Sequence, residues 1–542
     1  MTPQILTFLK DAAKSNGPRI FTASAVSGVA NALTIVIVTA AAQDYAQMNI
    51  RYLAMYLLCV GIYTITFKYA MSQTARDVRG RINQTNTTIA GKIKRADLRS
   101  FEKIDHNLIY TTLSENTEII FEASRLVVSC ASSTLMLLFS SLYLAFISQT
   151  AFWIATFLIL CSAVGYLHNQ KKIEKELILS SAKENEFFEM LDHLIDGFTE
   201  IKMHDARCTD ILENYLKPIS NELKALKLRT ESKFLNNQIY AQSFWFLLIA
   251  SIVFLLPQIS STPPKKVMSI TMIVLFNLGP IATIVASVPI IVKANFAIFR
   301  LKSLEEKLDA SADFEPTSPA EPFESTHAFQ SIELRNLYFK YEDPMTAGGF
   351  SIGPIDLKID ANEIIFFVGG NGSGKTTLLK NIAGLYYPDR GNVLYNGMMV
   401  NQHNYDHYRN MMSAIFTEFH LFDRLYGLTD VDVEKVNALF RMMKLFDKTS
   451  YSEGKFSTIN LSTGQRKRLA VINALMENRH VLIFDELAAD QDPEFRNYFY
   501  EVLLKALKSE GKTIICSSHD DRYFHVADRI IKMEYGKIMS GA

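Results

Sequence analysis

Two short runs in the chain combine the residue types needed to hold a phosphate group and to activate water. The first, residues 369–376, reads Gly-Gly-Asn-Gly-Ser-Gly-Lys-Thr and fits the pattern G-x-x-x-x-G-K-[ST]. It lies between an apolar, strand-like run at residues 363–368 and a helix-like run that begins near Thr376. Backbone amides of glycine can turn toward phosphate oxygens without a Cβ clash, and a helix N-terminus adds a favourable dipole. The sequence therefore predicts a phosphate-binding loop.

The side chains of this loop are suited to a nucleotide. We expect Lys375 to reach the β- and γ-phosphates and the Thr376 hydroxyl to ligate Mg²⁺. The nucleotide-binding residues predicted in this region are Gly369, Asn371, Gly372, Ser373, Gly374, Lys375, Thr376 and Thr377.

The second run, at residues 481–486, reads Val-Leu-Ile-Phe-Asp-Glu. It predicts a buried strand that ends in two carboxylates. Asp485 can hold the metal ion or its water, and Glu486 can polarise an attacking water molecule. We therefore expect Asp485 to be a metal ligand and Glu486 to be catalytic.

The stretch between these runs contains Leu461-Ser462-Thr463-Gly464-Gln465-Arg466-Lys467-Arg468-Leu469. On its own, this stretch predicts a helix capped by a serine. It also resembles the signature sequence of ABC transporters, with Thr463 where that family most often has glycine. The resemblance implies that Ser462, Gly464 and Gln465 cover the γ-phosphate of an ATP molecule held by the phosphate loop of another subunit. A complete active site would then need two ATPase domains.

Three more residues resemble elements of the same family, in the family's order along the chain. Tyr341 is similar to the aromatic residue that stacks on adenine, and Asp492 is similar to the aspartate of the D-loop. His519 follows a predicted strand at residues 513–516 and resembles the switch histidine that contacts the γ-phosphate. The resemblance implies that His519 is catalytic and that Tyr341 and Asp492 belong to the ATP site.

One position departs from the family pattern. The family usually has a glutamine in a segment similar to residues 414–422, where this chain has Thr417 followed by Glu418. Alignment on the end of the segment makes Thr417 the predicted metal ligand, with Glu418 as the alternative. The surrounding residues 401–447 look helix-rich and are expected to present the signature stretch.

The composition indicates a membrane protein. Hydrophobic residues make up 49% of the chain and charged residues 21%, and Lys+Arg equals Asp+Glu at 56 each, so no overall charge favours a nucleic-acid partner. Apolar runs long enough, or nearly long enough, to cross a bilayer occur six times in the first three hundred residues. We place these runs near residues 20–42, 53–71, 126–147, 152–167, 240–256 and 268–292.

The joins between these runs predict their layout and orientation. Joins after the second and fourth runs are long, charged and poor in glycine and proline, so we expect the membrane helices to continue into water there. Positive charge is concentrated in the amino-terminal segment and the first long join, which places both, and the ATPase, in the cytoplasm. Residues 196–202, in the second long join, are expected either to dock on the ATPase or to form an exposed charged helix. Phe244 and Trp245 either pack between helices or line a cavity.

These observations predict an all-α six-helix transmembrane domain followed by an α/β P-loop ABC ATPase domain. The expected boundaries are 1–302 for the transmembrane domain with its long cytoplasmic extensions, 303–328 for a linker that is rich in proline and acidic residues, and 329–542 for the nucleotide-binding domain.

The whole chain resembles a half-size ABC exporter, and within that family the bacterial cyclic-peptide and siderophore exporters. The resemblance implies a homodimer in the bacterial inner membrane that uses ATP and Mg²⁺, contacts membrane lipids, and exports a small peptide-like molecule. Two alternatives remain. One is a lipid or drug exporter on the same scaffold. The other is a membrane-bound ABC ATPase with a sensing or assembly role.

Overall fold

The computed structural model describes residues 4–14, 16–43, 50–104, 106–260, 262–311, 329–341, 349–401 and 403–539. The chain forms two compact units, one of residues 1–92 and 104–307 and the other of residues 93–103 and 308–542. The predicted linker falls largely on residues 312–328, outside the described residues, while residues 303–310 belong to a helix. The domain boundaries proposed from the sequence therefore stay predictions.

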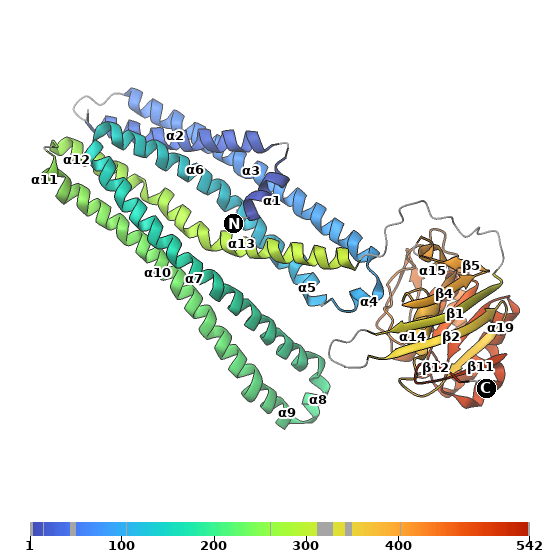
Figure 1. Cartoon of the computed structure of the whole chain (residues 1–542). Coiled ribbons are helices and arrows are strands. Elements are labelled where there is room, and N and C mark those ends of the chain that lie inside the picture. The colour runs from blue at the N-terminus through green and yellow to red at the C-terminus, as the bar shows by residue number, and fades with distance from the viewer. Residues whose placement is uncertain are drawn as a thin grey trace. The chain divides into compact units, whose positions relative to one another are not determined.

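The first unit is built entirely of helices (Figure 1). Its helices are α1 (Gln4–Ala12), α2 (Gly17–Gln43), α3 (Ile50–Arg95), α5 (His106–Thr111), α6 (Thr117–Ile147), α7 (Gln149–Asp196), α8 (Phe198–Met203), α9 (Asp205–Asp210), α10 (Lys217–Ala250), α11 (Leu256–Ile259), α12 (Pro264–Phe276) and α13 (Leu278–Ala310). Short π-helical segments join α5 to α6, α9 to α10 and α10 to α11 without a break.

Six helical stretches among the described residues are long and apolar enough to cross a membrane, which confirms the predicted fold class. They are Gly17–Gln43, Ile50–Arg95, His106–Ile147, Gln149–Tyr166, Asp205–Ile259 and Pro264–Ala310. The share of the apolar window that is buried inside the unit ranges from 6% in Ile50–Arg95 to 44% in Gly17–Gln43, so more than half of each window is not buried. Apolar side chains that face outward along a whole helix need an apolar solvent, as lipid provides.

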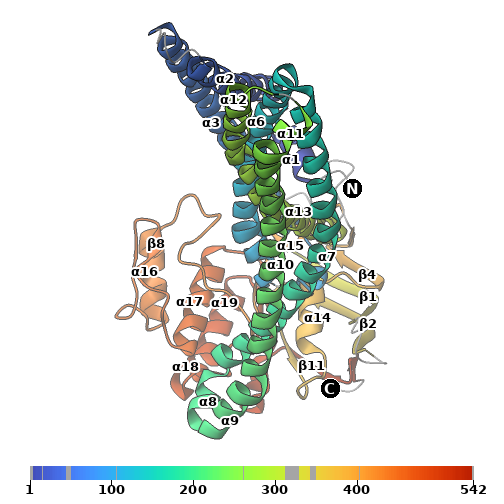
Figure 2. The same cartoon turned by 90° about the vertical axis from the view of Figure 1, so that its left-hand side faces the viewer.

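The two longest joins continue as helices, as the sequence predicted. Helices α7 and α10 lie side by side along their length in both views and are connected through α8 and α9 (Figures 1 and 2). Beyond the apolar part, ion pairs join the two helices, including Lys183 with Glu222 at 2.6 Å and Lys227 with Glu184 at 2.5 Å. Several charged side chains of this kind are costly in a hydrocarbon core, so we expect this part of the hairpin to extend into water.

The sixth membrane stretch is interrupted at Asn277, between α12 and α13. Asn277 is buried, and its side-chain oxygen accepts a hydrogen bond of 2.9 Å from the Ser140 hydroxyl on α6. This bond between helices satisfies a polar group at the bend, as a broken membrane helix requires.

The second unit contains a mixed α/β fold around three sheets. The strands are β1 (Ser331–Lys340), β2 (Ser351–Asp360), β3 (Ile364–Val368), β4 (Arg390–Tyr395), β5 (Met398–Val400), β6 (Met412–Ile415), β7 (Tyr451–Ser452), β8 (Lys455–Phe456), β9 (Val481–Asp485), β10 (Thr513–Ser517), β11 (Arg529–Glu534) and β12 (Lys537–Ile538). The helices are α4 (Leu98–Phe101), α14 (Lys375–Ile382), α15 (Tyr405–Arg409), α16 (Val433–Met442), α17 (Thr463–Met476), α18 (Pro493–Asn497) and α19 (Leu504–Ser509).

The central sheet has the order β12-β11-β3-β10-β9-β6, and its strands from β11 to β6 are parallel. A second, antiparallel sheet has the order β2-β1-β4-β5. Side chains of β3 alternate between two cores: Phe366 packs with residues of α16–α19, and Phe367 packs with residues of α14 and the antiparallel sheet. A parallel strand covered on both faces reads as a continuous apolar run, as residues 363–368 do. Figure 2 shows α16 and β8 at one end of this unit and β1, β2 and β4 at the other.

The strand β6 corrects part of the sequence analysis. Residues 401–447 were expected to be helix-rich, but their described part contains β6, a long irregular stretch and the two short helices α15 and α16. Residues Met412–Ile415 pair in parallel with β9, from Met412 with Val481 to Ile415 with Phe484. Short apolar runs do not distinguish strand from helix, so tertiary pairing decides here.

Candidate functional site

The segments predicted to bind phosphate, to hold the metal ion and to activate water meet at one edge of the central sheet. Strands β3, β6, β9 and β10 are parallel, and the segment that follows each of them carries one of the predicted residues. In parallel sheets the carboxyl ends of the strands share one edge, where α/β proteins bind their ligands. The sequence motifs, which lie far apart along the chain, therefore belong to a single site.

The phosphate loop connects β3 to α14. Gly369 has φ +152°, and a Cβ at this position would lie 2.2 Å from the carbonyl oxygen of Met533. Gly374, with φ +100°, stands directly before α14. The Ser373 hydroxyl is buried and has no hydrogen-bond partner in the described part of the chain. An orphaned donor inside a glycine-rich loop fits a loop that is completed by phosphate oxygens.

Lys375 lies folded across this loop. Its side chain is 5% exposed, and Nζ donates to the carbonyl oxygens of Gly369 at 3.0 Å and Gly370 at 3.3 Å. Burial lowers the pKa of Lys375, while the nearby Glu486 carboxylate acts in the opposite direction. An incoming phosphate group would replace the carbonyl contacts with a negative partner and so relieve the cost of the buried ammonium.

Asp485 is the centre of a cluster of hydroxyl groups. It is 1% exposed, and its Oδ2 accepts from Thr376 Oγ1 at 2.8 Å and from Thr417 Oγ1 at 3.2 Å. Its Oδ1 accepts from Ser517 Oγ at 2.6 Å. The structure thus places Thr417, at the end of β6, against the carboxylate that was predicted to bind metal.

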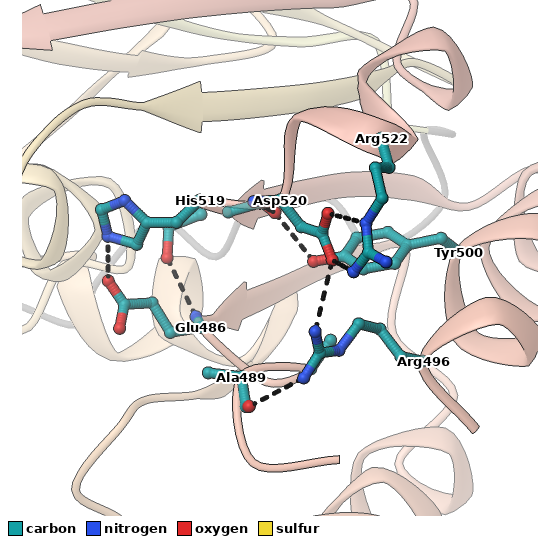
Figure 3. Close-up of a pocket in the computed structure, with 10 residues that line it drawn as sticks. Glu486, Ala489, Arg496, Tyr500, His519, Asp520 and Arg522 are labelled. Carbon is teal, nitrogen blue, oxygen red and sulfur yellow. Dashed lines mark hydrogen bonds and ion pairs between the residues drawn. The ribbon is translucent and has the colours of Figure 1, made fainter. Parts of the chain in front are cut away.

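Glu486 follows β9 in an unusual backbone conformation, with φ +48°. Its amide donates to Ser517 Oγ at 2.9 Å, and its Oε1 lies 2.9 Å from His519 Nε2 (Figure 3). Nζ of Lys375 is 3.8 Å from the same carboxylate oxygen and 3.1 Å from His519 Nε2. Lys375, Glu486 and His519 are therefore in mutual contact.

A cavity of about 310 Å³ opens beside Glu486 and His519. Figure 3 shows Arg496, Asp520 and Arg522 on the side of this cavity away from His519. Arg522 donates to both oxygens of Asp520 at 2.8 Å, and this pairing is the main reason why the pKa of Asp520 is lowered. Asp520 also pairs with Arg496 at 3.5 Å, so one carboxylate faces two arginines and these three residues keep a net positive charge.

Tyr341 lies at the end of β1 within an aromatic cluster. Its ring meets Phe339 edge-on at 5.2 Å and Tyr386 at 5.8 Å. Its hydroxyl lies 3.4 Å from Thr377 Oγ1 and 3.3 Å from the Tyr386 hydroxyl. The predicted adenine-stacking residue is therefore directly connected to α14, which carries the phosphate-loop threonines.

The signature residues at the start of α17 contact the segment that follows β9. Ser462 caps α17, accepting from the Gln465 amide while Gln465 Oε1 accepts from the Ser462 amide at 3.1 Å, so the expected N-cap is confirmed. The Gly464 carbonyl accepts from Gln491 Nε2 at 3.0 Å. Asp492 caps α18 by accepting from the Phe495 amide at 2.8 Å. The start of α17 thus packs on residues 486–492, which we call the acidic turn.

The small helix α4 belongs to the ATPase unit although its residues lie in the first long join. Arg99 pairs with Asp389 at 3.0 Å and donates to the Lys340 carbonyl at 2.8 Å. Glu102 accepts from Lys380 Nζ at 3.0 Å and from the Tyr386 hydroxyl at 2.8 Å. No motif in the sequence points to these contacts.

Two further contributors were also missed by sequence reasoning. Ser517 bridges Asp485 and Glu486, and Lys467 inside the signature stretch donates to the Glu486 carbonyl at 3.1 Å. Lys467 belongs to the signature stretch, and Ser517 lies two residues before His519. No spacing rule assigns a role to a serine at a strand end or to one lysine among several basic residues.

Together, the glycine-rich loop, the carboxylate at the end of β9 and the parallel sheet define a P-loop ATPase, here in one chain with a bundle of membrane-length helices. Residues 352–489 match the protein-family model described as ABC transporter. The chain is 33% identical over 410 residues to the ATP-binding protein SyrD of Pseudomonas syringae, a match that covers 74% of this chain and 72% of that protein.

Two other relatives show how widely the resemblance extends. An ATP-dependent lipid A-core flippase of Alkalilimnicola ehrlichii is 25% identical over 500 residues, covering 88% of this chain and 81% of that protein. The alpha-hemolysin translocation ATP-binding protein HlyB of Escherichia coli is 31% identical over 240 residues, covering 41% of this chain and 33% of that protein.

The chain belongs to the ABC transporters. It is a multi-pass, half-size ABC exporter whose ATPase domain couples ATP hydrolysis to transport.

Proposed function

We propose that this exporter moves a small peptide-like molecule, such as a cyclic peptide or a siderophore precursor, out across the bacterial inner membrane. The observation that carries the transport role is the presence, in one chain, of six membrane-length helices and an assembled ATPase site. The choice of cargo is supported by the resemblance of the signature stretch, with its Thr463, to that exporter subfamily. The positive charge of the first long join supports a cytoplasmic ATPase.

We further propose that the working form is a homodimer. Among the described residues, the side-chain hydrogen bonds of Ser462 and Gln465 are made within the start of α17. The phosphate loop, in contrast, is bound to Asp485, Glu486 and His519. By the resemblance to ABC transporters, a nucleotide held by the loop is covered by the signature surface of a second copy, and that arrangement would bind two ATP molecules between two copies.

In the proposed hydrolysis step, water attacks the γ-phosphorus, the bond to the β–γ bridging oxygen breaks, and ADP and phosphate are released. Glu486 accepts the proton of the attacking water and is oriented by its contact with His519. Lys375 binds the β- and γ-phosphates, whose negative charge compensates its buried ammonium. His519 contacts the γ-phosphate, and Tyr341 stacks on the adenine ring.

The oxygen atoms of Thr376, Thr417 and Asp485 fit Mg²⁺, because both hydroxyls lie within hydrogen-bond distance of the same Asp485 oxygen and all three residues supply hard ligands. When bound there, Mg²⁺ would neutralise charge on the nucleotide phosphates. Thr417 is the better candidate than Glu418 for the position where the family has glutamine, since its hydroxyl already contacts Asp485.

We also propose that α4 passes the state of the ATPase to the membrane helices. It lies in the join after α3 and is bound to the ATPase through Arg99 and Glu102. Residues 196–202, the earlier candidate for this role, form part of α7 and α8 in the first unit, and their docking stays a prediction.

A lipid or drug cargo is the second candidate, and one observation favours it. A cavity of about 330 Å³ in the first unit is lined almost entirely by apolar side chains of α6, α7, α10 and α13, including Phe244 and Trp245. A site of this size is at the lower end for small ligands and suits an alkyl chain better than a polar peptide. The relationship to a lipid A-core flippase points the same way.

The test is ATP hydrolysis by the purified protein in lipid nanodiscs, with Glu486→Gln as the matched inactive variant. Cyclic peptides, siderophore precursors and acyl lipids are added in parallel. Stimulation by the peptide class, absent in Glu486→Gln, supports the proposed cargo, and stimulation by acyl lipids alone supports the alternative. Hydrolysis that no compound changes, with no export from loaded vesicles, would contradict a transport role and favour a sensing or assembly ATPase.

A further inference from the structure

Lys467 is the one basic residue of the signature stretch that is fully buried, with 3% exposure. Its Nζ donates to the Glu486 carbonyl at 3.1 Å and pairs with the Asp490 carboxylate at 2.6 Å. A buried ammonium has a large desolvation cost unless it is paired and hydrogen-bonded. Both partners of Lys467 belong to the acidic turn. Their contacts with the ammonium offset its desolvation cost and at the same time attach the acidic turn to α17.

The Glu486 carbonyl needs such a contact because of its backbone. Glu486 has φ +48°, which is an uncommon conformation for a residue with a side chain. The carbonyl accepts from the Ala489 amide at 3.2 Å and from Lys467, while the Glu486 amide donates to Ser517. These bonds hold both sides of the residue in the conformation that directs its carboxylate to His519 (Figure 3).

The contact is part of a wider attachment between α17 and the acidic turn. Arg468 Nε donates to Gln491 Oε1 at 2.9 Å, and Gln491 Nε2 donates to the Gly464 carbonyl at 3.0 Å. Arg468 also pairs with Asp492 and lies over the Phe495 ring at 4.0 Å. The start of α17 and the acidic turn are thus joined at several points and can move as one body. Of the α17 side chains in these contacts, only Lys467 reaches Glu486 itself.

We propose that Lys467 is a positioning residue for ATP hydrolysis. It acts through the Glu486 carbonyl and keeps the catalytic carboxylate aimed at the water-activation site, without touching the nucleotide held by its own loop. This inference rests on the proposed role of Glu486. Ser462, which caps α17, and Lys467 lie five residues apart. A shift of the signature surface therefore moves Lys467 as well, and through its hydrogen bond changes the position of Glu486 in the same chain.

The test compares Lys467→Met, Lys467→Gln and wild type as full-length protein in nanodiscs. Methionine keeps the length of the side chain but cannot donate, whereas the glutamine amide can still donate to the Glu486 carbonyl. Leaving that carbonyl without its charged partner is expected to lower kcat by about tenfold or more while KM for ATP stays within about twofold. Lys467→Gln is expected to recover part of kcat. Lys505→Met, which breaks an exposed ion pair with Glu501 in the same unit, is the control and should leave both constants near wild type.

A second measurement separates positioning from general damage to the fold. The residual, slow hydrolysis of Glu486→Gln is compared with that of the double variant Lys467→Met/Glu486→Gln. If Lys467 acts through the Glu486 carboxylate, the added substitution changes this residual rate by less than about twofold. An equal loss in both backgrounds, a rise in KM without a fall in kcat, or wild-type kcat in Lys467→Met would overturn the inference.

Two cases need a separate reading: a Lys467→Met protein that does not fold, and a Glu486→Gln protein that stays active. If Lys467→Met does not fold, Asp490→Asn tests the same contact, because it removes the ion pair that holds the ammonium in place. A smaller fall in kcat at unchanged KM is then expected, and unchanged kcat would count against the inference. If Glu486→Gln itself hydrolyses ATP at the wild-type rate, the proposed role of Glu486 fails first.

Discussion

Removal of the Ser517 hydroxyl is the most informative single perturbation of this site. Ser517 is 1% exposed at the end of β10, and its Oγ donates to Asp485 Oδ1 at 2.6 Å while accepting from the Glu486 amide at 2.9 Å. One hydroxyl thus orients both the predicted metal-binding carboxylate and the predicted catalytic residue. Ser517→Ala leaves the amide and the carboxylate oxygen without this partner, with no gain in packing.

The size of the effect follows from these two bonds. A hydrogen bond to a charged group contributes about 1.5–3 kcal/mol, and an unsatisfied buried partner costs about 1–3 kcal/mol. The free energy of unfolding of the ATPase unit should therefore fall by about 2–3 kcal/mol. If half of this loss reflects a displaced Glu486 in the transition state, kcat falls by about tenfold, because each 1.36 kcal/mol is a factor of about ten.

The assay measures kcat, KM for ATP and Tm of Ser517→Ala, with Ser518→Ala as the matched control. Ser518 is 2% exposed and makes two similar bonds, with the Tyr500 hydroxyl at 2.8 Å and the Asp520 amide at 3.1 Å, but it contacts neither Asp485 nor Glu486. We expect Ser518→Ala to lose somewhat less stability, because both of its bonds join uncharged groups, and only Ser517→Ala to lose kcat. Equal kcat in the two variants would refute the reasoning.

Four further predictions concern other parts of the site. Glu486→Gln should bind ATP with an affinity close to that of wild type but hydrolyse it at least about a hundredfold more slowly, measured by nucleotide binding and phosphate release, because the proton acceptor is gone. Thr417→Ala should raise the Mg²⁺ concentration needed for half-maximal hydrolysis, whereas Glu418→Ala should not, because only Thr417 contacts Asp485. Glu102→Gln should lower the amount of cargo exported per ATP hydrolysed while basal hydrolysis stays near wild type, since the half-exposed contacts of Glu102 contribute only about 0.5–1 kcal/mol. Asp492→Asn should lower Tm at neutral pH and match wild type in strong acid.

The sign of the Asp492 effect follows from its surroundings. The Phe495 amide, assisted by Arg468, lowers the pKa of Asp492 below its usual 3.8. A carboxyl group with a lowered pKa stabilises the fold above about pH 3.8, and this contribution is lost as the pH falls through the lower folded value. Asparagine is also a good helix N-cap, so the comparison isolates the charge. A difference in Tm that persists in strong acid would show that the cap geometry, not the charge, is responsible.

Local patterns were enough to predict the membrane helices and the phosphate loop. Runs of apolar residues predict long helices by length alone, and the glycine pattern predicts the turn between β3 and α14. The loop needs glycine at positions 369 and 374, because both have a positive φ that other residues rarely adopt. A backbone requirement of this kind can be recognised directly from the residue type.

What was missed depends on contacts between distant residues. Lys467 and Ser517 are one lysine and one serine among many until the fold brings them to Glu486. The contact of Arg99 with Asp389 joins residues 290 positions apart. Strand β6 lies within residues 401–447, which were expected to be helix-rich. A run as short as Met412–Ile415 has no clear period of its own, and pairing with β9 defines it as a strand.

The attachment of α4 to the ATPase also has a consequence for the order in which the chain is made. Residues 93–103 leave the ribosome long before Asp389 and Tyr386 exist, so this part of the ATPase unit must wait, already tethered beside the membrane, until its partners are synthesised. During that interval it has to stay soluble on its own. Its charged residues Asp97, Arg99, Glu102 and Lys103 suit the first condition because they are well hydrated alone, and Arg99 and Glu102 later form ion pairs that join the two pieces of the unit.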